Sequence, residues 1–317
     1  MKDATGDSVE DTVAQLGLPR ATFYRWEERA QQGRLEDRRV VPHHSVPAPT
    51  PGEVAAVREY ALGHPLTGYK RLCWLMVDAD VAYLRPYQVY DILSAQGLIR
   101  RREMVIADPL HRPAAPDHPD QVWHIDLMYL YIRPRWYYLV DILDGYSRFL
   151  VHWSLNLTMT ADTVTLTAQE AVERLDRRRP GEPQIVHDNG SQFLSKDWRD
   201  FVTGTGITDI RTRIAHPQSN GRVESLHRTH RAEGLIEEEL DDYYQALDAM
   251  AGWGRYYNYD RPHSALQYLR PADYYRGDPA ACLVARTRKL AQATEERRSY
   301  WGNPARTAGN HEGGVVE

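Results

Sequence analysis

The segment His187-Asp188-Asn189-Gly190-Ser191-Gln192-Phe193 decides the fold prediction when it is read with Asn220-Gly221-Arg222-Val223-Glu224. An apolar run, residues 183–186, precedes the first segment and is typical of a buried strand. Asp188 therefore stands at the end of that strand, where Asp-Asn-Gly indicates a sharp turn. Glu224 follows another turn after 35 intervening residues and opens a stretch of helical composition.

A third acid, Asp126, lies upstream in an apolar, strand-like run, residues 122–127. Two strand-borne acids and one helical acid form a single cluster if the two strands are neighbours. Grouped carboxylates suit hard divalent cations, which bind oxygen ligands and keep room for water and phosphate. Each acid alone is equally well a capping or solvated residue, but the three with their flanking motifs predict a metal site.

These motifs make the chain resemble the integrase-core transposases of bacterial insertion sequences, which are relatives of retroviral integrases. The matching residues are Trp123-His124-Ile125-Asp126, His187-Asp188-Asn189-Gly190-Ser191-Gln192, His216-Pro217-Gln218-Ser219-Asn220-Gly221-Arg222-Val223-Glu224, His227-Arg228-Thr229, and Tyr257-Asn258-Tyr259-Asp260-Arg261-Pro262-His263-Ser264-Ala265-Leu266. The resemblance covers roughly residues 8–275 and is strongest over residues 119–272. Motifs in this order are far more specific than an isolated acidic triad.

The resemblance implies a DNA transposase. It makes Asp126, Asp188 and Glu224 the catalytic residues and the ligands of two Mg²⁺ ions, for which Mn²⁺ would substitute. The implied reactions are strand cleavage at the terminal inverted repeats and strand transfer. The implied partners are double-stranded DNA, as element ends and as target, and further copies of the chain, at least as a dimer, because two DNA ends are processed together.

The predicted organisation combines two small all-α units with an α/β core. Its parts are a helix-turn-helix domain (1–39), a linker (40–52), a second helix-turn-helix-like domain (53–105), a linker (106–118), the catalytic core (119–278), and a partly disordered C-terminal extension (279–317). In the core we expect five strands, at 122–131, 136–142, 148–155, 185–186 and 207–210, with helices between and after them. This pattern alone predicts a mixed sheet with helices on both faces, and the resemblance makes that sheet ribonuclease-H-like.

Candidate DNA contacts begin in residues 8–30. Gly17 separates two helical stretches, and Pro19 suits the start of the second. Arg20, Thr22 and Arg25 would face outward from this second helix, while Phe23 or Tyr24 and Trp26 pack inward. The pattern favours a DNA-binding helix-turn-helix over a plain helical hairpin, although short matches of this kind are common.

Further candidates are basic residues in the second unit and on the helix of Glu224. The phosphate contacts proposed in the second unit are Lys70, Arg71, Arg100, Arg101 and Arg102, with a solvated charged face as an equal alternative for each. Arg228 and Arg231 stand four and seven residues after Glu224, on its side of the helix. In the family the latter position is usually lysine, so arginine keeps the charge and changes the geometry. Pairing of Arg231 with Glu233, Glu237 or Glu238 is the alternative.

Several residues beside the acids are supporting candidates. His124 and His187 would tune the site or position water, although packed, hydrogen-bonded histidines are the commoner outcome. Asn189, Asn220 and Gly221 belong to the turns that present the acids. Trp253, Tyr256 and Tyr257 are interpreted as core residues rather than as a stacking platform.

Net charge, cysteine content and hydropathy limit the possible functions of the protein. The net charge is −5, which argues mildly against tight non-specific DNA binding, but residues 113–275 alone carry −7. Two cysteines far apart indicate no disulfide framework and no zinc site. Without an apolar run of spanning length or a signal core, a cytoplasmic, nucleoid-associated protein is expected. The alternative functions are a catalytically silent DNA-binding repressor derived from a transposase and a nuclease on the same fold.

Overall fold

The computed structural model describes residues 9–15, 17–33, 46–99, 116–132, 134–176, 179–188, 190–211, 221–233 and 240–303. Within these ranges the side chains of residues 11, 12 and 221–224 are not described. The chain forms two compact units, Met1–Pro47 and Ala48–Glu317. None of the described helices combines the length and the apolar character that crossing a membrane requires.

The first unit contains two helices, α2 (Val9–Gln15) and α3 (Arg20–Gln31), at the positions that the sequence predicts. Gly17 lies between them with φ of 62°, a left-handed conformation that glycine adopts without strain. Trp26 was expected to pack inward, but 43% of it is exposed, and α3 has no buried residue. That prediction was wrong because two short helices enclose almost no interior: Val13 is the buried apolar residue among those described in this unit.

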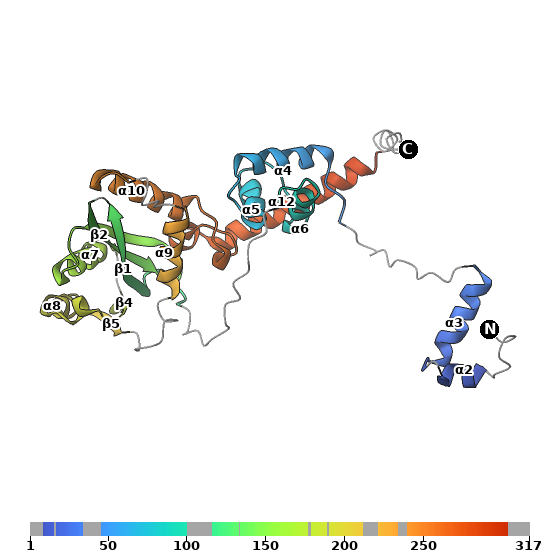
Figure 1. Cartoon of the computed structure of the whole chain (residues 1–317), viewed down its shortest axis with the longest axis horizontal. Helices are drawn as coiled ribbons and strands as arrows, with labels where there is room; N and C mark the ends of the chain where they lie inside the picture. The colour runs from blue at the N-terminus through green and yellow to red at the C-terminus, as the bar shows by residue number, and fades with distance from the viewer. Residues whose placement is uncertain are drawn as a thin grey trace. The chain divides into compact units, whose positions relative to one another are not determined.

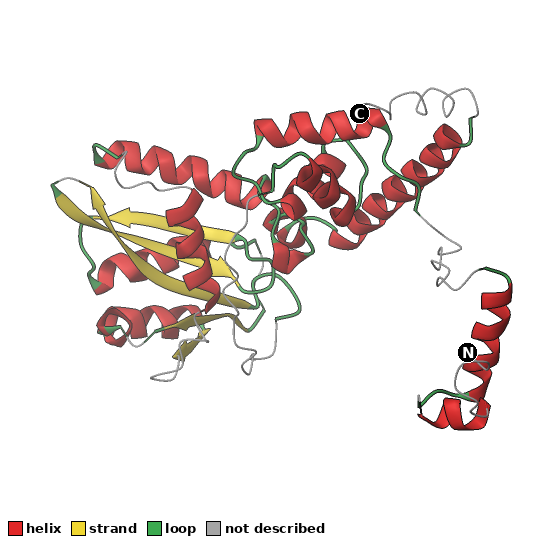
Figure 2. Cartoon of the chain, turned by 45° about the vertical axis from the view of Figure 1, so that its right-hand side comes forward, coloured by secondary structure: helices red, strands yellow, loops and turns green. Residues whose placement is uncertain are grey.

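The core of the second unit is a five-stranded sheet (Figure 2). The strands are β1 (Val122–Ile132), β2 (Arg135–Asp144), β3 (Leu150–Asn156), β4 (Gly181–His187) and β5 (Ile207–Arg211). Their order is β3-β2-β1-β4-β5, with β1 antiparallel to β2 and parallel to β4. This is the ribonuclease-H-like arrangement, so the predicted fold class is confirmed.

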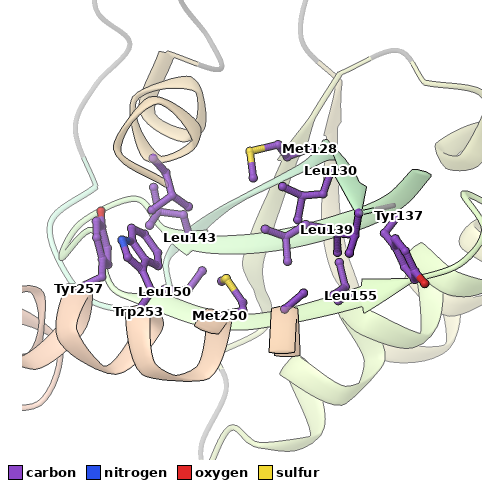
Figure 3. Packing of buried hydrophobic residues seen from close by; sticks show 13 residues of the cluster. Met128, Leu130, Tyr137, Leu139, Leu143, Leu150, Leu155, Met250, Trp253 and Tyr257 are labelled. Atoms are coloured by element: carbon purple, nitrogen blue, oxygen red, sulfur yellow. The ribbon is translucent and has the colours of Figure 1, made fainter. Parts of the chain in front are cut away.

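Side-chain alternation along the strands gives the sheet two buried faces. Trp123, Ile125 and Ile142 pack with α7 (Ala161–Glu173) and α8 (Lys196–Thr205). Met128, Leu130 and Leu139 point to the other face and pack with α9 (Gly221–Glu233) and α10 (Tyr243–Tyr259), as Figure 3 shows. The predicted core positions on α10 are correct for Trp253 and Tyr257, which are buried, and wrong for Tyr256, which is exposed.

A helical subdomain with its own apolar core precedes the sheet. It consists of α4 (Pro51–Gly63), α5 (Tyr69–Asp78) and α6 (Pro86–Ala95), around a cluster that includes Val57, Leu72 and Val89. Thr50 caps α4 through a reciprocal pair of hydrogen bonds with Glu53, which defines where the helix begins.

The segment predicted as a partly disordered extension contains a 23-residue helix, α12 (Pro279–Trp301), after the short α11 (Pro271–Tyr275). It lies against α4, α5 and α6 in Figure 1. The buried Arg286 donates two hydrogen bonds to Asp78, at 2.8 and 2.7 Å, and Arg297 donates to Glu53 at 2.9 Å. The helix is therefore held by buried charge pairs with residues some 200 positions earlier. Residues 304–317 lie outside the described residues.

Arg286→Ala is expected to destabilise the helical subdomain by about 3 kcal/mol, because it leaves the Asp78 carboxylate and the carbonyls of Gln267 and Tyr268 without their donor. Arg288→Ala, at an exposed position of the same helix, is the matched control. Urea unfolding followed by circular dichroism measures both, and equal midpoints for the two variants would contradict the structural role of Arg286.

Candidate active site

Asp126 and Asp188 stand at the same level of neighbouring strands. His124 of β1 pairs in register with Val186 of β4, and each aspartate follows its paired residue by two positions. The Asp188 carboxylate accepts a hydrogen bond from the Gly190 N–H at 2.9 Å, which holds the turn after β4. The sheet thus brings together two acids that are 62 residues apart in the sequence.

The Asp126 carboxyl is desolvated and close to other carboxylates. Burial raises its pKa to about 6, and the charges of Asp188 and Asp141 add to the rise. The charge of His227 and the Leu127 N–H, which donates to Asp126 Oδ1 at 2.9 Å, act in the opposite direction. A carboxyl in this environment lacks a positive partner of sufficient charge, and a cation would supply it.

Glu224 lies in the first turn of α9, and its side chain is outside the described residues. The described part of α9 nevertheless shows where the helix sits. One turn further on, His227 Nδ1 lies 3.7 Å from Asp126 Oδ2. The helix that carries the third acid therefore packs on β1 beside the first. Among the described side chains, which exclude that of Glu224, no three His, Cys, Asp or Glu residues are arranged to hold a metal ion.

Asp141, His227 and His230 form a group next to Asp126 that was not predicted from the sequence as part of the site, although His227 stands in one of the family motifs. Asp141 is the cross-strand partner of Asp126 and is fully buried. Its Oδ2 lies 3.3 Å from His227 Nε2 and 3.4 Å from His230 Nε2. His230 in turn stacks on Trp253 with ring centroids 3.6 Å apart. The available signal was an acid at an inward position of a strand, followed much later by two histidines three residues apart on one helix.

Opposing effects set the charges in this group. Burial alone would raise the pKa of Asp141, but His230 and His227 outweigh it and hold the pKa at about 2. Burial lowers the pKa of His227, yet the Asp141 and Asp126 carboxylates raise it above its ordinary value against the repulsion of Arg231. Asp141 is thus an anion that attracts the two histidines of α9 to the sheet.

His187 and His124 are both buried. His187 Nε2 lies 2.6 Å from Asp209 Oδ1, its Nδ1 lies 2.5 Å from the Asp188 carbonyl, and its ring stacks on Phe193. These contacts make it a packed histidine that holds the backbone of Asp188. Gly221 begins α9, whereas Asn189 and Asn220 lie outside the described residues.

The residues predicted to contact DNA differ in whether they are free to do so or are paired within the chain. Arg71 Nη1 lies 3.2 Å from Glu233 Oε1, and Arg261 binds the same carboxylate at 2.6 and 3.0 Å, so Arg71 is engaged within the chain. The Glu233 carboxylate is therefore paired with Arg71 and Arg261 rather than with Arg231. Arg231 makes no ion pair with any residue that the structure describes.

The remaining candidates sit as follows. Lys70 and Arg228 are exposed, as is Arg25 of α3, where Thr22 is half-buried. Arg20, in the same helix, pairs with Glu10 at 2.5 Å on the surface. Residues 100–102, like Glu237 and Glu238, lie outside the described residues.

The chain is similar to several known proteins. Two family models described as "Integrase core domain" match residues 116–217 and 205–271. An uncharacterized 31.7 kDa protein of insertion element IS407 from Burkholderia multivorans is 27% identical over 243 residues, which cover 74% of this chain and 86% of the relative. A protein of insertion element IS136 from Agrobacterium fabrum is 32% identical over 142 residues, which cover 44% of this chain and 73% of that protein.

The chain belongs to the integrase-core transposase family of bacterial insertion elements. Among solved structures, the HTLV-2 integrase catalytic core domain in complex with magnesium is 18% identical, with a TM-score of 0.41, and the match covers 50% of this chain and 98% of that one. The family models and the insertion-element relatives identify the family. The predicted family is confirmed.

Asp126→Asn is expected to stabilise this transposase above pH 6, in the presence of a chelator, by up to about 3 kcal/mol. Because the pKa of Asp126 is raised in the folded state, this carboxyl loses its proton at lower pH in the unfolded chain than in the folded protein. The free energy of unfolding of the wild type therefore falls as the pH rises from about 4 to about 6. The advantage of the variant should therefore grow over that range and then stay constant. Urea unfolding at several pH values measures it, and Asp197→Asn, at an exposed carboxylate of α8, is the control. A destabilised or pH-independent Asp126→Asn variant would contradict the description of this site.

Proposed function

We propose that the protein is a DNA transposase that binds the terminal inverted repeats of its insertion element and catalyses metal-dependent strand cleavage and strand transfer. The observation that carries the proposal is the desolvated Asp126, level with Asp188 and packed beside the helix that bears Glu224. The folded state gains no stability from a desolvated carboxyl such as Asp126, whereas a cation-dependent site needs one.

The donor set fits a hard divalent cation, here Mg²⁺. Asp126, Asp188 and Glu224 would hold it, since carboxylate oxygens are the ligands that Mg²⁺ prefers. A pair of such ions, when bound, neutralises the phosphate and activates the attacking and leaving oxygens. The protein's own contribution is to hold the carboxylates in place: the Gly190 N–H and His187 fix the turn of Asp188, and Asp141 anchors α9.

DNA would approach along α9. Arg228 and Arg231 are exposed on this helix, one and two turns after Glu224. The helices of the first unit would read the element ends through Thr22 and Arg25. We propose that at least two copies of the chain assemble on paired DNA ends.

Asp126→Asn, Asp188→Asn and Glu224→Gln are each expected to abolish cleavage of a duplex that carries the inverted repeats flanking the gene, in Mg²⁺ or Mn²⁺, while DNA binding persists. Removing one ligand disables the metal site, and the DNA is held by other residues. Asp197→Asn, at an exposed acid of α8, is the control and should cleave normally. Strand cleavage is measured on a denaturing gel. Substantial cleavage by any of the three variants of Asp126, Asp188 or Glu224 would contradict their assignment as catalytic residues. A wild type that binds the repeats but never cuts them would favour the silent repressor.

Arg231→Ala is expected to reduce cleavage more than binding and to lower the slope of binding against salt by about one, the effect of losing one phosphate contact. Arg231→Lys should retain much of the activity, because one phosphate contact does not need a guanidinium. Arg199→Ala, on α8 at the opposite face of the sheet, is the matched control. Titration of labelled duplex at several salt concentrations measures the slope, and an unchanged slope with wild-type cleavage would remove Arg231 from the DNA contacts.

A further inference from the structure

Glu233, the last residue of α9, accepts hydrogen bonds from two arginines that belong to separate parts of the chain. Arg261, which follows α10, donates to it from Nε at 2.6 Å and from Nη2 at 3.0 Å. Arg71, in the first turn of α5, donates to it from Nη1 at 3.2 Å. One carboxylate therefore joins the helical subdomain to the helix that bears Glu224.

The two arginine contacts differ in strength. Arg261 binds the carboxylate through two hydrogen bonds, and 7% of its side chain is exposed. Arg71 contributes one longer hydrogen bond, and the side chains of Arg71 and Glu233 are 24% and 27% exposed. Bidentate pairs are the stronger kind, whereas a partly exposed single pair changes an equilibrium by at most about five-fold. Arg261 therefore holds Glu233 in place, and Arg71 is the partner that can leave.

Positive charge outweighs the Glu233 carboxylate in its surroundings. Burial lowers the pKa of His263 to about 3, and three arginine charges lower it further, those of Arg261, Arg148 and Arg71. Glu233 acts in the opposite direction and does not outweigh them. Arg261 Nη1 also donates to His263 Nε2 at 3.0 Å. An anion that replaced Glu233 beside Arg71 would therefore meet a favourable field.

Arg71 lies in a part of α5 that suits contact with DNA. Lys70, the preceding residue, is exposed, and no acid stands in the first turn of this helix. A backbone phosphate would give Arg71 a charge-assisted hydrogen bond in place of the one to Glu233, and it would also release a counterion. Because the lost ion pair is partly exposed and weak, the exchange favours the phosphate at low salt.

We propose that Glu233 is an autoinhibitory residue, which withholds Arg71 from DNA in the free protein and is displaced from it by a backbone phosphate when DNA binds. Arg261 keeps Glu233 and the end of α9 in place during the exchange. The exchange removes an ion pair between α5 and α9, so DNA binding by the helical subdomain is coupled to the helix of the third acid. The inference rests on the proposed binding of DNA and does not depend on the acidic triad.

The test is a double-mutant cycle on Arg71 and Glu233 in the full-length protein. The probe is a fluorescein-labelled duplex that carries the inverted repeats flanking the gene, and fluorescence anisotropy gives its dissociation constant. Glu233→Gln should tighten binding about three-fold, because Arg71 no longer has to leave a carboxylate, while the glutamine oxygen still accepts from Arg261. In the Arg71→Ala background the same substitution should have no effect beyond that of losing one negative charge.

Asp260→Asn is the matched control for that loss of charge. Asp260 is an exposed acid in the same region: burial raises the pKa of Tyr256, and the charges of Glu233 and Asp260 both add to the rise. Its substitution removes a negative charge and leaves the pair of Arg71 with Glu233 intact. The tightening by Glu233→Gln should therefore exceed that by Asp260→Asn.

A second variant separates the contact from the charge. Glu233→Asp keeps the negative charge, but the side chain is one methylene shorter and no longer reaches Arg71. It should also tighten binding, and it replaces Glu233→Gln in the cycle if circular dichroism shows that the glutamine variant does not fold. Equal tightening by either variant with and without Arg71 would overturn the proposal, and so would binding no tighter than that of Asp260→Asn.

The salt dependence of binding reports directly on Arg71. Arg71→Ala should lower the slope of binding against salt by about one, because one phosphate contact is lost. An unchanged slope would mean that Arg71 stays with Glu233 in the complex, which overturns the proposal.

Cleavage separates this inference from the proposed function. A wild type that cleaves its repeats, with no coupling between Arg71 and Glu233 in the cycle, overturns the autoinhibition and leaves the transposase function standing. Coupling in a protein that binds the repeats but never cuts them supports the autoinhibition and removes the cleavage function. A wild type that does not bind the duplex overturns both.

Discussion

The contact of the buried Asp141 carboxylate with His227 and His230 is the interaction on which the active-site region depends. A fully buried carboxylate costs several kcal/mol, and His227, whose pKa this carboxylate raises, offsets part of that cost. Both histidines lie on α9, so the charge that must be neutralised on β2 also determines where this helix packs. Glu224 stands in the first turn of the same helix. The helix that carries Glu224 is thus held on the sheet by Asp141, which is not one of the three predicted catalytic acids.

The same region carries an opposing cost. Asp126, directly across from Asp141, has no equally strong partner, and burial raises its pKa to about 6. The ionised form of this carboxyl lowers the stability of the folded state. Such a cost is expected where a group contributes to binding rather than to stability. The two carboxylates of this strand pair therefore differ in their surroundings: Asp141 has two imidazoles of α9 within 3.4 Å, whereas the nearest imidazole nitrogen to Asp126 lies at 3.7 Å.

Ion pairs also connect segments that are far apart in the chain. Arg286 of α12 reaches Asp78 at the end of α5, and Arg71 of α5 reaches Glu233 at the end of α9, where Arg261 binds as well. The helical subdomain is in this way joined both to the C-terminal helix and to the helix of the third acid. Arg71 of α5, which the sequence suggests as a phosphate contact, therefore forms an ion pair within the chain.

The sequence by itself determined the strands and the core helices, and it predicted Asp126, Asp188 and Glu224 as the acids of the site, because alternation, turn residues and motif order are local signals. It did not reveal Asp141, the docking of α12 or the engagement of Arg71, since each depends on a partner between 86 and 208 residues away. The exposed rings of Tyr129, Tyr131 and Trp136 show the same division. In the sequence they are ordinary strand residues, and they are open to solvent because β3 pairing ends at Tyr138. Burial and charge compensation are properties of the assembled sheet, so tertiary structure alone decides them.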